Sequence, residues 1–227
     1  CFEYAYMAAK IALENMTPVI LMTDTYLANG TGLWCIPQLS ELPAIHPQGV
    51  PEELKGKYNP ALRDENNVRY WAYAGMEGYE HRNIGLERDA QKGSISTNPE
   101  NHERMVRARQ AKVDQVANRI PELRVQCNAQ SDTLLVGWGS TEGHLHAAAN
   151  ELNCALAHFN YINPLPKNTA NVLRAYKRIV VCELNSGQFA GYLRSKISGV
   201  NLLQYNEIMG QPFAVERIVE YVKGLND

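Results

Sequence analysis

Thr133-Leu134-Leu135-Val136-Gly137-Trp138-Gly139-Ser140-Thr141 is the stretch that decides the fold. A short apolar run stops at two glycines, and two hydroxyl residues follow. This pattern predicts a buried strand that turns directly into the N-terminus of a helix. The first N–H groups of such a helix have no partner inside it, so they can meet an anion or a neighbouring loop. What this helix end contacts decides how the domain is interpreted.

From residue 131 onward, short apolar runs alternate with amphipathic helical patterns. Four strands are predicted, at Thr133–Val136, Ala155–Phe159, Ile179–Cys182 and Asn201–Tyr205. Strands that alternate with helices require a mostly parallel sheet covered on both faces, with right-handed crossovers. The fold class is therefore predicted as α/β, a mostly parallel sheet with helices on both faces, preceded by an irregular arm.

The preceding residues have much weaker periodicity. A helix is predicted to end near Asn15, and the apolar run Thr17–Asp24 is interpreted as a buried strand. Residues 33–97 show no sustained period, apart from a possible short strand at Val68–Ala74. Their frequent aromatic residues argue against a disordered linker, so an arm that packs on other subunits or domains is favoured. Asn98-Pro99 then predicts a helix start, with Asn98 as N-cap.

Composition limits the class of partner. The 22 basic and 24 acidic residues nearly cancel, which argues against bulk binding to nucleic acid or an anionic membrane. No apolar stretch approaches the length of a membrane span. The chain opens at Cys1 without a secretory leader and is interpreted as a piece of something longer.

The cysteines are odd in number and widely spaced, with no Cys-x-x-Cys pair; they are Cys1, Cys35, Cys127, Cys154 and Cys182. Buried free thiols are favoured over disulfides, which indicates reducing cytoplasm. An iron–sulfur cluster needs grouped thiolates, so this chain alone is not expected to hold one.

Two ligand sites are considered and disfavoured. Gly137-x-Gly139 suggests a dinucleotide loop, but Glu142 stands where the third glycine belongs, and its carboxylate would repel a pyrophosphate. The favoured alternative is that the glycines permit a tight turn and that Ser140 or Thr141 caps the helix. A zinc site is also disfavoured, because residues two apart on a helix point about 200° apart. The ligands of such a zinc site would have been His144, His146, His158 and Cys154. The three histidines are instead interpreted as surface or capping residues.

Polar loops are predicted to meet at the carboxyl edge of the sheet, where open parallel sheets bind ligands. They follow the first three predicted strands and include residues 163–168. The candidate cofactor-binding residues at this edge are Gly137, Gly139, Ser140, Thr141, Asn185 and Gly187. A subunit or domain interface is an equally weighted alternative. No catalytic or metal-binding residue is assigned, and the charged run 80–89 is interpreted as a solvated loop or a salt-bridging surface.

Several short motifs follow one another along the chain. They are Met16–Asp24, Tyr26–Asn29, Gly85–Glu87, Asn98–His102, Gly137–Thr141, Asn163–Asn168, Glu183–Gln188 and Gly210–Phe213. Together they resemble one family, the alpha subunit of 2-oxoacid:ferredoxin oxidoreductases, and within it the enzymes that act on 2-oxoglutarate. The resemblance covers essentially the whole chain and includes the end of the family's pyrimidine-binding domain.

The resemblance implies an activity. These enzymes decarboxylate a 2-oxoacid oxidatively on thiamine diphosphate, pass electrons through an iron–sulfur cluster to ferredoxin, and release an acyl-CoA. It implies that a beta subunit holds the diphosphate, its Mg and the cluster, so no cofactor is expected in this chain alone. The expected partners are the beta subunit and, through the holoenzyme, ferredoxin and CoA, in a cytoplasmic oligomer.

The resemblance also implies boundaries: the end of a pyrimidine-binding domain at 1–30, a connector at 31–97 and a transketolase C-terminal-like α/β domain at 98–227. The family's Tyr-Pro-Ile-Thr-Pro segment and pyrimidine-contacting glutamate would lie upstream, so the chain is expected to be architectural and inactive alone. Two alternatives stay open. One is a free-standing α/β module that binds CoA or a nucleotide at the sheet edge, and the other is a purely structural dimerisation domain.

Overall fold

The computed structural model describes residues 1–225, which divide into two compact units. The first comprises Cys1–Leu21 and Gly32–Arg119, and the second comprises Met22–Thr31 and the chain from Ile120 onward. Each unit is described by itself. The functional identities assigned to residues 1–30, 31–97 and 98–227 stay predictions.

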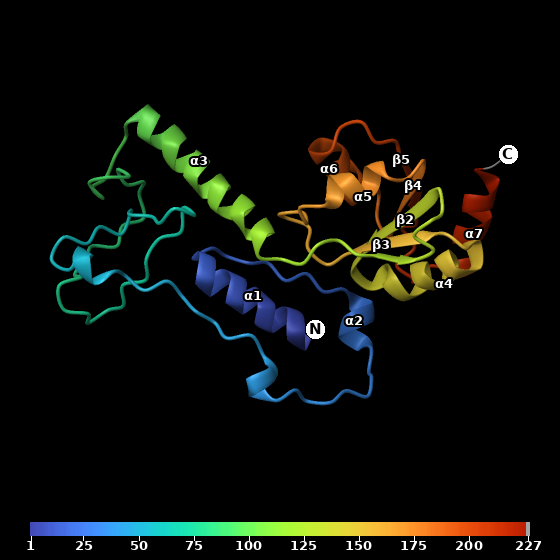
Figure 1. The fold of residues 1–227 in the computed structure, drawn as a ribbon, viewed down its shortest axis with the longest axis horizontal. Helices are drawn as coiled ribbons and strands as arrows, with labels where there is room; N and C mark the ends of the chain where they lie inside the picture. Colours follow the sequence, from blue (N-terminus) through green and yellow to red (C-terminus); the bar gives the residue numbers. More distant parts are fainter. Residues whose placement is uncertain (226–227) are drawn as a thin grey trace. The chain divides into compact units, whose positions relative to one another are not determined.

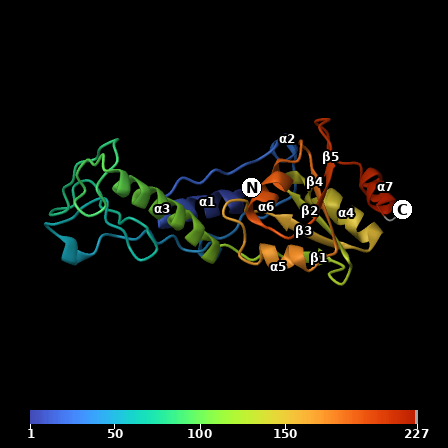
Figure 2. The same cartoon turned by 90° about the horizontal axis from the view of Figure 1, so that it is seen from above.

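The second unit is built on a five-stranded sheet with the order β1-β3-β2-β4-β5 (Figures 1 and 2). Strands β3, β2, β4 and β5 are parallel, as predicted, and β1 pairs antiparallel with β3 at the edge. The bounds are Val125–Cys127 for β1, Thr133–Trp138 for β2, Ala155–Phe159 for β3, Arg178–Glu183 for β4 and Leu202–Asn206 for β5. The antiparallel β1, only three residues long, was not predicted.

Helices cover both faces of the sheet, which confirms the predicted fold class. One face packs against α4 (Glu142–Leu152) and α7 (Val215–Gly224), and the other against α5 (Thr169–Arg174) and α6 (Gln188–Lys196), as Figures 1 and 2 show. Along β2, Leu134 and Val136 enter the core under α6, while Leu135 enters the core under α4. Successive strand residues point to opposite faces, so a strand buried on both faces must be apolar throughout.

The first unit has two long helices, α1 (Phe2–Asn15) and α3 (Pro99–Gln115). Helix α3 begins as predicted, because the Asn101 N–H donates to the Asn98 side chain at 2.7 Å. Residues 32–97 contain only two short 3-10 turns, Leu39–Glu41 (η1) and Glu52–Leu54 (η2), and isolated bridges, and a third short turn, Val116–Asn118 (η3), follows α3. This matches the predicted irregular arm, but the strand predicted at Val68–Ala74 is reduced to single bridges.

The buried strand predicted at Thr17–Asp24 is wrong. This segment has no regular secondary structure and pairs with no strand, and the Ile20 side chain is 86% exposed. Its apolar run ends at a short helix, α2 (Thr25–Asn29), which Asp24 caps. An apolar run predicts burial only where a second surface is present to cover it.

Among residues 1–225, no helix has both the length and the apolar content needed to cross a bilayer.

Gly137 is expected to be essential for the packing of α4 on β2. A methyl group added there would lie 2.1 Å from Leu145 Cδ1 and 2.7 Å from Thr141 Oγ1, and Leu145 is fully buried. Gly137→Ala should therefore lower the free energy of unfolding by about 1–3 kcal/mol, measured by urea unfolding. Gly143→Ala is the control, because a methyl group there meets nothing within 4 Å. Equal stabilities of the two variants would contradict this packing argument.

Candidate functional site

The turn after β2 is a 3-10 turn, η4 (Gly139–Thr141), that leads into α4. Gly139 has φ 64°, in the left-handed region that favours glycine, so the predicted glycine turn is confirmed. The predicted cap is wrong. Thr141 Oγ1 donates to the Trp138 carbonyl at 2.8 Å, and no side chain of the turn accepts from the N-terminus of α4. The hydroxyl closes the turn onto the end of the strand instead.

Asp24 supplies the negative charge at this turn. Its Oδ2 accepts from the Ser140 N–H at 3.1 Å, while its Oδ1 accepts from the Leu27 N–H at 3.0 Å and caps α2. Burial alone would raise the pKa of Asp24, but the hydrogen bonds from Ser140 and Leu27 outweigh it and lower the pKa. The free N–H that the sequence predicted therefore meets a carboxylate from the 22–31 segment of the same unit.

Glu183, at the end of β4, is a second carboxylate that sequence reasoning missed. It is completely buried, and it accepts from the N–H groups of Phe189 at 2.8 Å and Ala190 at 2.9 Å, at the start of α6. It also accepts from Trp138 Nε1 at 3.3 Å, which joins the ends of β2 and β4. An acidic residue that ends an apolar strand a few residues before a helix is the signal that could have found it.

The loop after β4 is held by its own side chains. Asn185 Oδ1 accepts from the N–H groups of Gly187 at 2.7 Å and Gln188 at 3.3 Å. Gly187 has φ 95°, and a methyl group there would lie 2.9 Å from Gln204 Oε1. Both residues therefore have structural reasons for their identity.

The loop after β3 contains a cis peptide bond before Pro164. Asn168 bonds Leu123 twice: its Oδ1 accepts from the Leu123 N–H at 2.8 Å, and its Nδ2 donates to the Leu123 carbonyl at 2.9 Å. Tyr192 of α6 donates to Asn163 Oδ1 at 3.2 Å. This loop is thus attached to the segment before β1 and to α6.

The structure does bring the predicted residues to one edge. Strand β2 lies between β3 and β4, so the three loops are neighbours at the carboxyl ends of the strands (Figure 2). The polar groups described for Ser140, Thr141 and Asn185 bond within the unit. This arrangement supports a joint between elements, while a cofactor-binding role for Gly137, Gly139, Ser140, Thr141, Asn185 and Gly187 stays a prediction.

The histidines and cysteines differ from expectation in two ways. His158 is 8% exposed, and neither ring nitrogen has a hydrogen-bond partner within bonding distance, so it is neither a surface nor a capping residue. Burial lowers the pKa of its imidazole. All five cysteines are free, but only Cys154 and Cys182 are buried.

With this geometry described, the relatives are informative. No family model matches the chain. The chain is 39% identical to the 2-oxoglutarate oxidoreductase subunit KorA of Mycobacterium tuberculosis, over 98% of its own length and 34% of that subunit. It is 22% and 23% identical to the 2-oxoglutarate synthase KorA subunits of Methanothermobacter marburgensis and Methanothermobacter thermautotrophicus, over 99% and 100% of the chain and 61% of each relative.

A solved structure agrees. The 2-oxoglutarate:ferredoxin oxidoreductase of Magnetococcus marinus, with 2-oxoglutarate, coenzyme A and succinyl-CoA bound, superposes with a TM-score of 0.75 and 26% identity over 83% of this chain and 34% of that one. The chain matches a C-terminal portion of the Mycobacterium tuberculosis KorA subunit. The predicted family resemblance is confirmed, and the chain spans about a third of the Mycobacterium tuberculosis subunit.

Glu183→Gln tests whether the buried carboxylate joins the three elements. An amide keeps the size but loses one acceptor oxygen and leaves buried N–H groups without a partner. The expected loss is about 1–3 kcal/mol in the free energy of unfolding by urea. Glu216→Gln, at an exposed position in the first turn of α7, should change it by less than about 0.5 kcal/mol. If Glu183→Gln and Glu216→Gln lower the free energy of unfolding equally, the Glu183 carboxylate is not required to join the three elements.

Asp24→Asn tests the carboxylate at the α4 turn. Because the folded state lowers the pKa of Asp24, its contribution is complete above the unfolded pKa and disappears as the pH falls through the folded pKa. The variant should unfold at lower urea than the parent at pH 6, by about 0.5–1 kcal/mol. The difference should shrink at pH 3. If the difference in the free energy of unfolding between parent and variant is the same at pH 6 and pH 3, the acceptor at this turn is not an ionised Asp24.

Proposed function

We propose that this chain is the C-terminal part of the alpha subunit of a thiamine-diphosphate-dependent 2-oxoglutarate:ferredoxin oxidoreductase. The observation that carries the proposal is the 39% identity to a KorA subunit over 98% of the chain. The structural similarity to an oxidoreductase with 2-oxoglutarate and coenzyme A bound supports it independently.

In the proposed reaction, 2-oxoglutarate loses its carboxylate as CO₂, and its remaining acyl group is oxidised by two electrons and transferred to the CoA thiol. Two one-electron carriers of the ferredoxin class take up the electrons, and the thiol proton is released. Thiamine diphosphate would supply the carbanion that adds to the keto carbon and the ring that accepts the electron pair.

The described residues offer no cluster of side chains for a metal ion. Among residues 1–225, no group of three or more His, Cys, Asp or Glu side chains is placed to hold one metal ion. The two buried cysteines are poor metal ligands because the thiolate is the form that binds a metal. Burial raises the pKa of the Cys154 thiol to about 11 and raises the pKa of the Cys182 thiol further. As the family resemblance implies, we assign thiamine diphosphate, Mg and the iron–sulfur cluster to other parts of the holoenzyme.

The role proposed for this chain is architectural. At the carboxyl edge of the sheet, Asp24 and Glu183 accept from the backbone at the starts of η4 and α6, and Asn185 closes its own loop. An edge whose loops are held by hydrogen bonds to Asp24, Glu183 and Asn185 is suited to hold elements in place. It is less suited to receive a ligand anion, which would have to displace a carboxylate.

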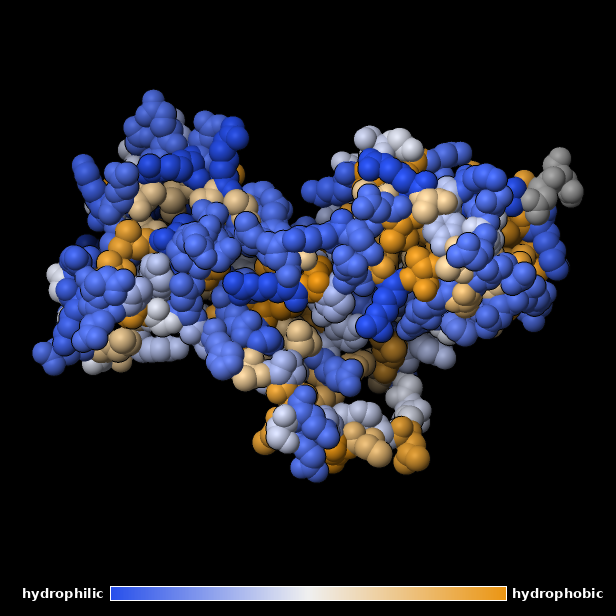
Figure 3. Space-filling view, viewed as in Figure 1, coloured by the Kyte–Doolittle hydropathy of each residue, from blue (hydrophilic) through white to orange (hydrophobic). Residues whose placement is uncertain are grey.

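A subunit partner is part of the proposal. Four large apolar side chains of the first unit are at least 80% exposed: Ile20, Leu33, Ile36 and Leu39. Figure 3 shows apolar side chains exposed on the face that it presents. Large apolar side chains left exposed in this way support a surface that another polypeptide covers. We assign it to the beta subunit or to the rest of the alpha subunit, in a cytoplasmic oligomer.

Reconstitution tests the activity. The full-length alpha subunit should be assembled with its beta subunit and supplied with thiamine diphosphate, Mg, CoA and an oxidised viologen. We expect viologen reduction that requires both 2-oxoglutarate and CoA and releases CO₂. Pyruvate in place of 2-oxoglutarate is the substrate control. If a complex that carries its cofactors fails to reduce viologen with every 2-oxoacid tested, the proposal is refuted.

Gly187→Val separates architecture from ligand binding at the sheet edge. Because Gly187 has φ 95° and a Cβ added there would lie 2.9 Å from Gln204 Oε1 and 3.1 Å from Asn206 Nδ2, a larger residue should reduce the fraction of complex that assembles. In the assembled fraction the KM for CoA should stay within about twofold. Gly191→Val, on α6, is the control, because a Cβ added at Gly191 meets no atom within 4 Å. A rise of tenfold or more in that KM would support the alternative, a CoA site at this edge.

A further inference from the structure

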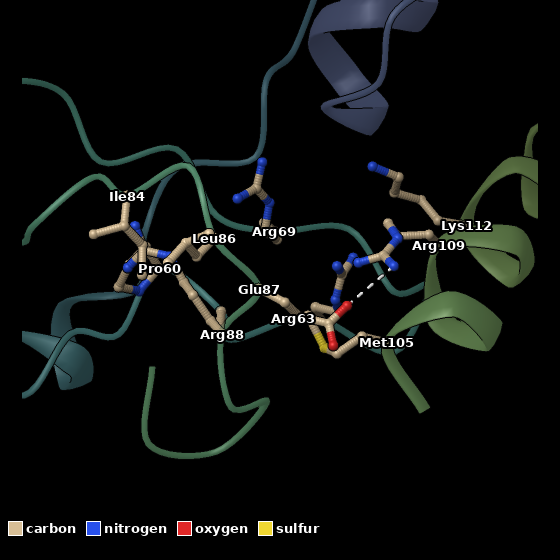
Figure 4. Close-up of a pocket in the computed structure, with 11 residues that line it drawn as sticks. Pro60, Arg63, Arg69, Ile84, Leu86, Glu87, Arg88, Met105, Arg109 and Lys112 are labelled. Atoms are coloured by element: carbon tan, nitrogen blue, oxygen red, sulfur yellow. Dashed lines mark hydrogen bonds and ion pairs between the residues drawn. The ribbon is translucent and has the colours of Figure 1, made fainter. Parts of the chain in front are cut away.

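The first unit contains a cavity of about 220 Å³ whose walls are strongly basic (Figure 4). Helix α3 forms one side, and the irregular segment 60–88 forms the rest. Its charged lining residues are Arg63, Arg69, Arg88, Arg109, Lys112 and the single acid Glu87. The sequence interpretation of the charged run 80–89 was a solvated loop or salt bridges to a partner. Glu87 and Arg88 of this run line the cavity.

Local structure directs these cations inward. Arg63 and Arg69 face each other across an antiparallel bridge, and Arg63 is fixed by its bond to the Asn67 carbonyl at 2.7 Å. Arg109 and Lys112 are three residues apart on α3, so they share one face of the helix. Lys112 is 7% exposed and donates to the Met16 carbonyl at 2.6 Å.

The cavity lacks enough negative charge to balance its cations. Glu87 pairs with Arg109 at 3.3 Å and also with His102 at 3.1 Å. Within residues 1–225, no carboxylate lies within ion-pair distance of Arg63, Arg69 or Lys112, and the buried Arg63 Nε has no acceptor. Burial and the neighbouring Arg63, Arg69 and Arg109 lower the pKa of Lys112 to about 8.

Partly buried cations packed together are costly unless an anion neutralises them and accepts their hydrogen bonds. Only one acid faces five cations here, so the structure leaves several positive charges unpaired. We propose that this cavity binds the phosphate group of a small molecule. A phosphate monoester carries about −1.5 to −2 charges at pH 7 and several acceptor oxygens, which suit arginine forks better than a single carboxylate does.

A second cavity of about 180 Å³ shares Pro60 and Arg69 with the first and is lined by aromatic side chains, including Tyr58, Tyr70, Trp71 and His81. Arg69 thus belongs to both cavities. Aromatic faces beside a phosphate site can stack on a nucleobase. The phosphate could therefore come from inorganic phosphate or from a nucleoside monophosphate, and affinity for the two distinguishes these sources.

Calorimetric titration of the assembled holoenzyme with inorganic phosphate at pH 7 tests the site. We expect saturable binding at one site per alpha subunit. Arg69→Gln and Lys112→Met should each weaken binding at least about tenfold, since each removes a charge-assisted bond. Arg107→Gln is the matched control, because Arg107 lies on α3 with a side chain 78% exposed and pairs with Glu103 instead. Unfolding midpoints within about 2 °C of the parent would show that the variants fold.

Adenosine monophosphate and adenosine form the second arm. If adenosine monophosphate binds about tenfold more tightly than phosphate, and Arg69→Gln abolishes this preference, the source of the phosphate is a nucleotide. Equal affinities would identify free phosphate. Three results would overturn the proposal: no binding of phosphate or the monophosphate, adenosine binding that Arg69→Gln leaves unchanged, or equal weakening by Arg107→Gln. The first is expected if an acidic side chain of another polypeptide fills the cavity.

Discussion

The carboxylate of Glu183 is the contact on which the second unit depends. It lies at the end of β4, accepts from the first N–H groups of α6, and bonds the indole N–H of Trp138 at the end of β2. A buried carboxylate is tolerable only when such donors surround it, and helix N-termini provide them together with a favourable dipole. One side chain therefore fixes the mutual position of two central strands and a covering helix.

The α4 turn is satisfied by the same chemistry from a distant part of the sequence. Asp24 reaches Ser140 across 116 positions and also caps α2, so one carboxylate connects the 22–31 segment to the sheet. Gly137 allows α4 to approach β2 closely, and Gly139 allows the chain to reverse. Both glycines therefore have a complete structural explanation that needs no ligand. The feature shared with dinucleotide-binding loops is the glycine turn between a strand and a helix.

The sheet could be predicted from the sequence because its strands are buried on both faces. Ala155–Phe159 and its parallel neighbours form continuous apolar runs, and these runs do not depend on distant residues. Val125–Cys127 escaped prediction, because three residues on a sheet edge carry no period. Thr17–Asp24 was wrongly interpreted because apolar content alone does not specify a pairing partner. At the site, the glycine turn was local and predictable, whereas the acceptor at Ser140 depended on Asp24.

The basic cavity was invisible to sequence reasoning for the same reason. Its cations are spread from Arg63 to Lys112, and each resembles an ordinary surface charge when it is considered alone. Within the second unit, the carboxylates Asp24 and Glu183 accept from N–H groups at the starts of helical elements, so their oxygens have hydrogen-bond donors inside the unit. Within the first unit, Lys112 and four arginines line a cavity whose lining includes one acid, Glu87. A fold that gives its carboxylates donors at one place and groups cations around a single acid at another points to the second place as the one that expects an external anion.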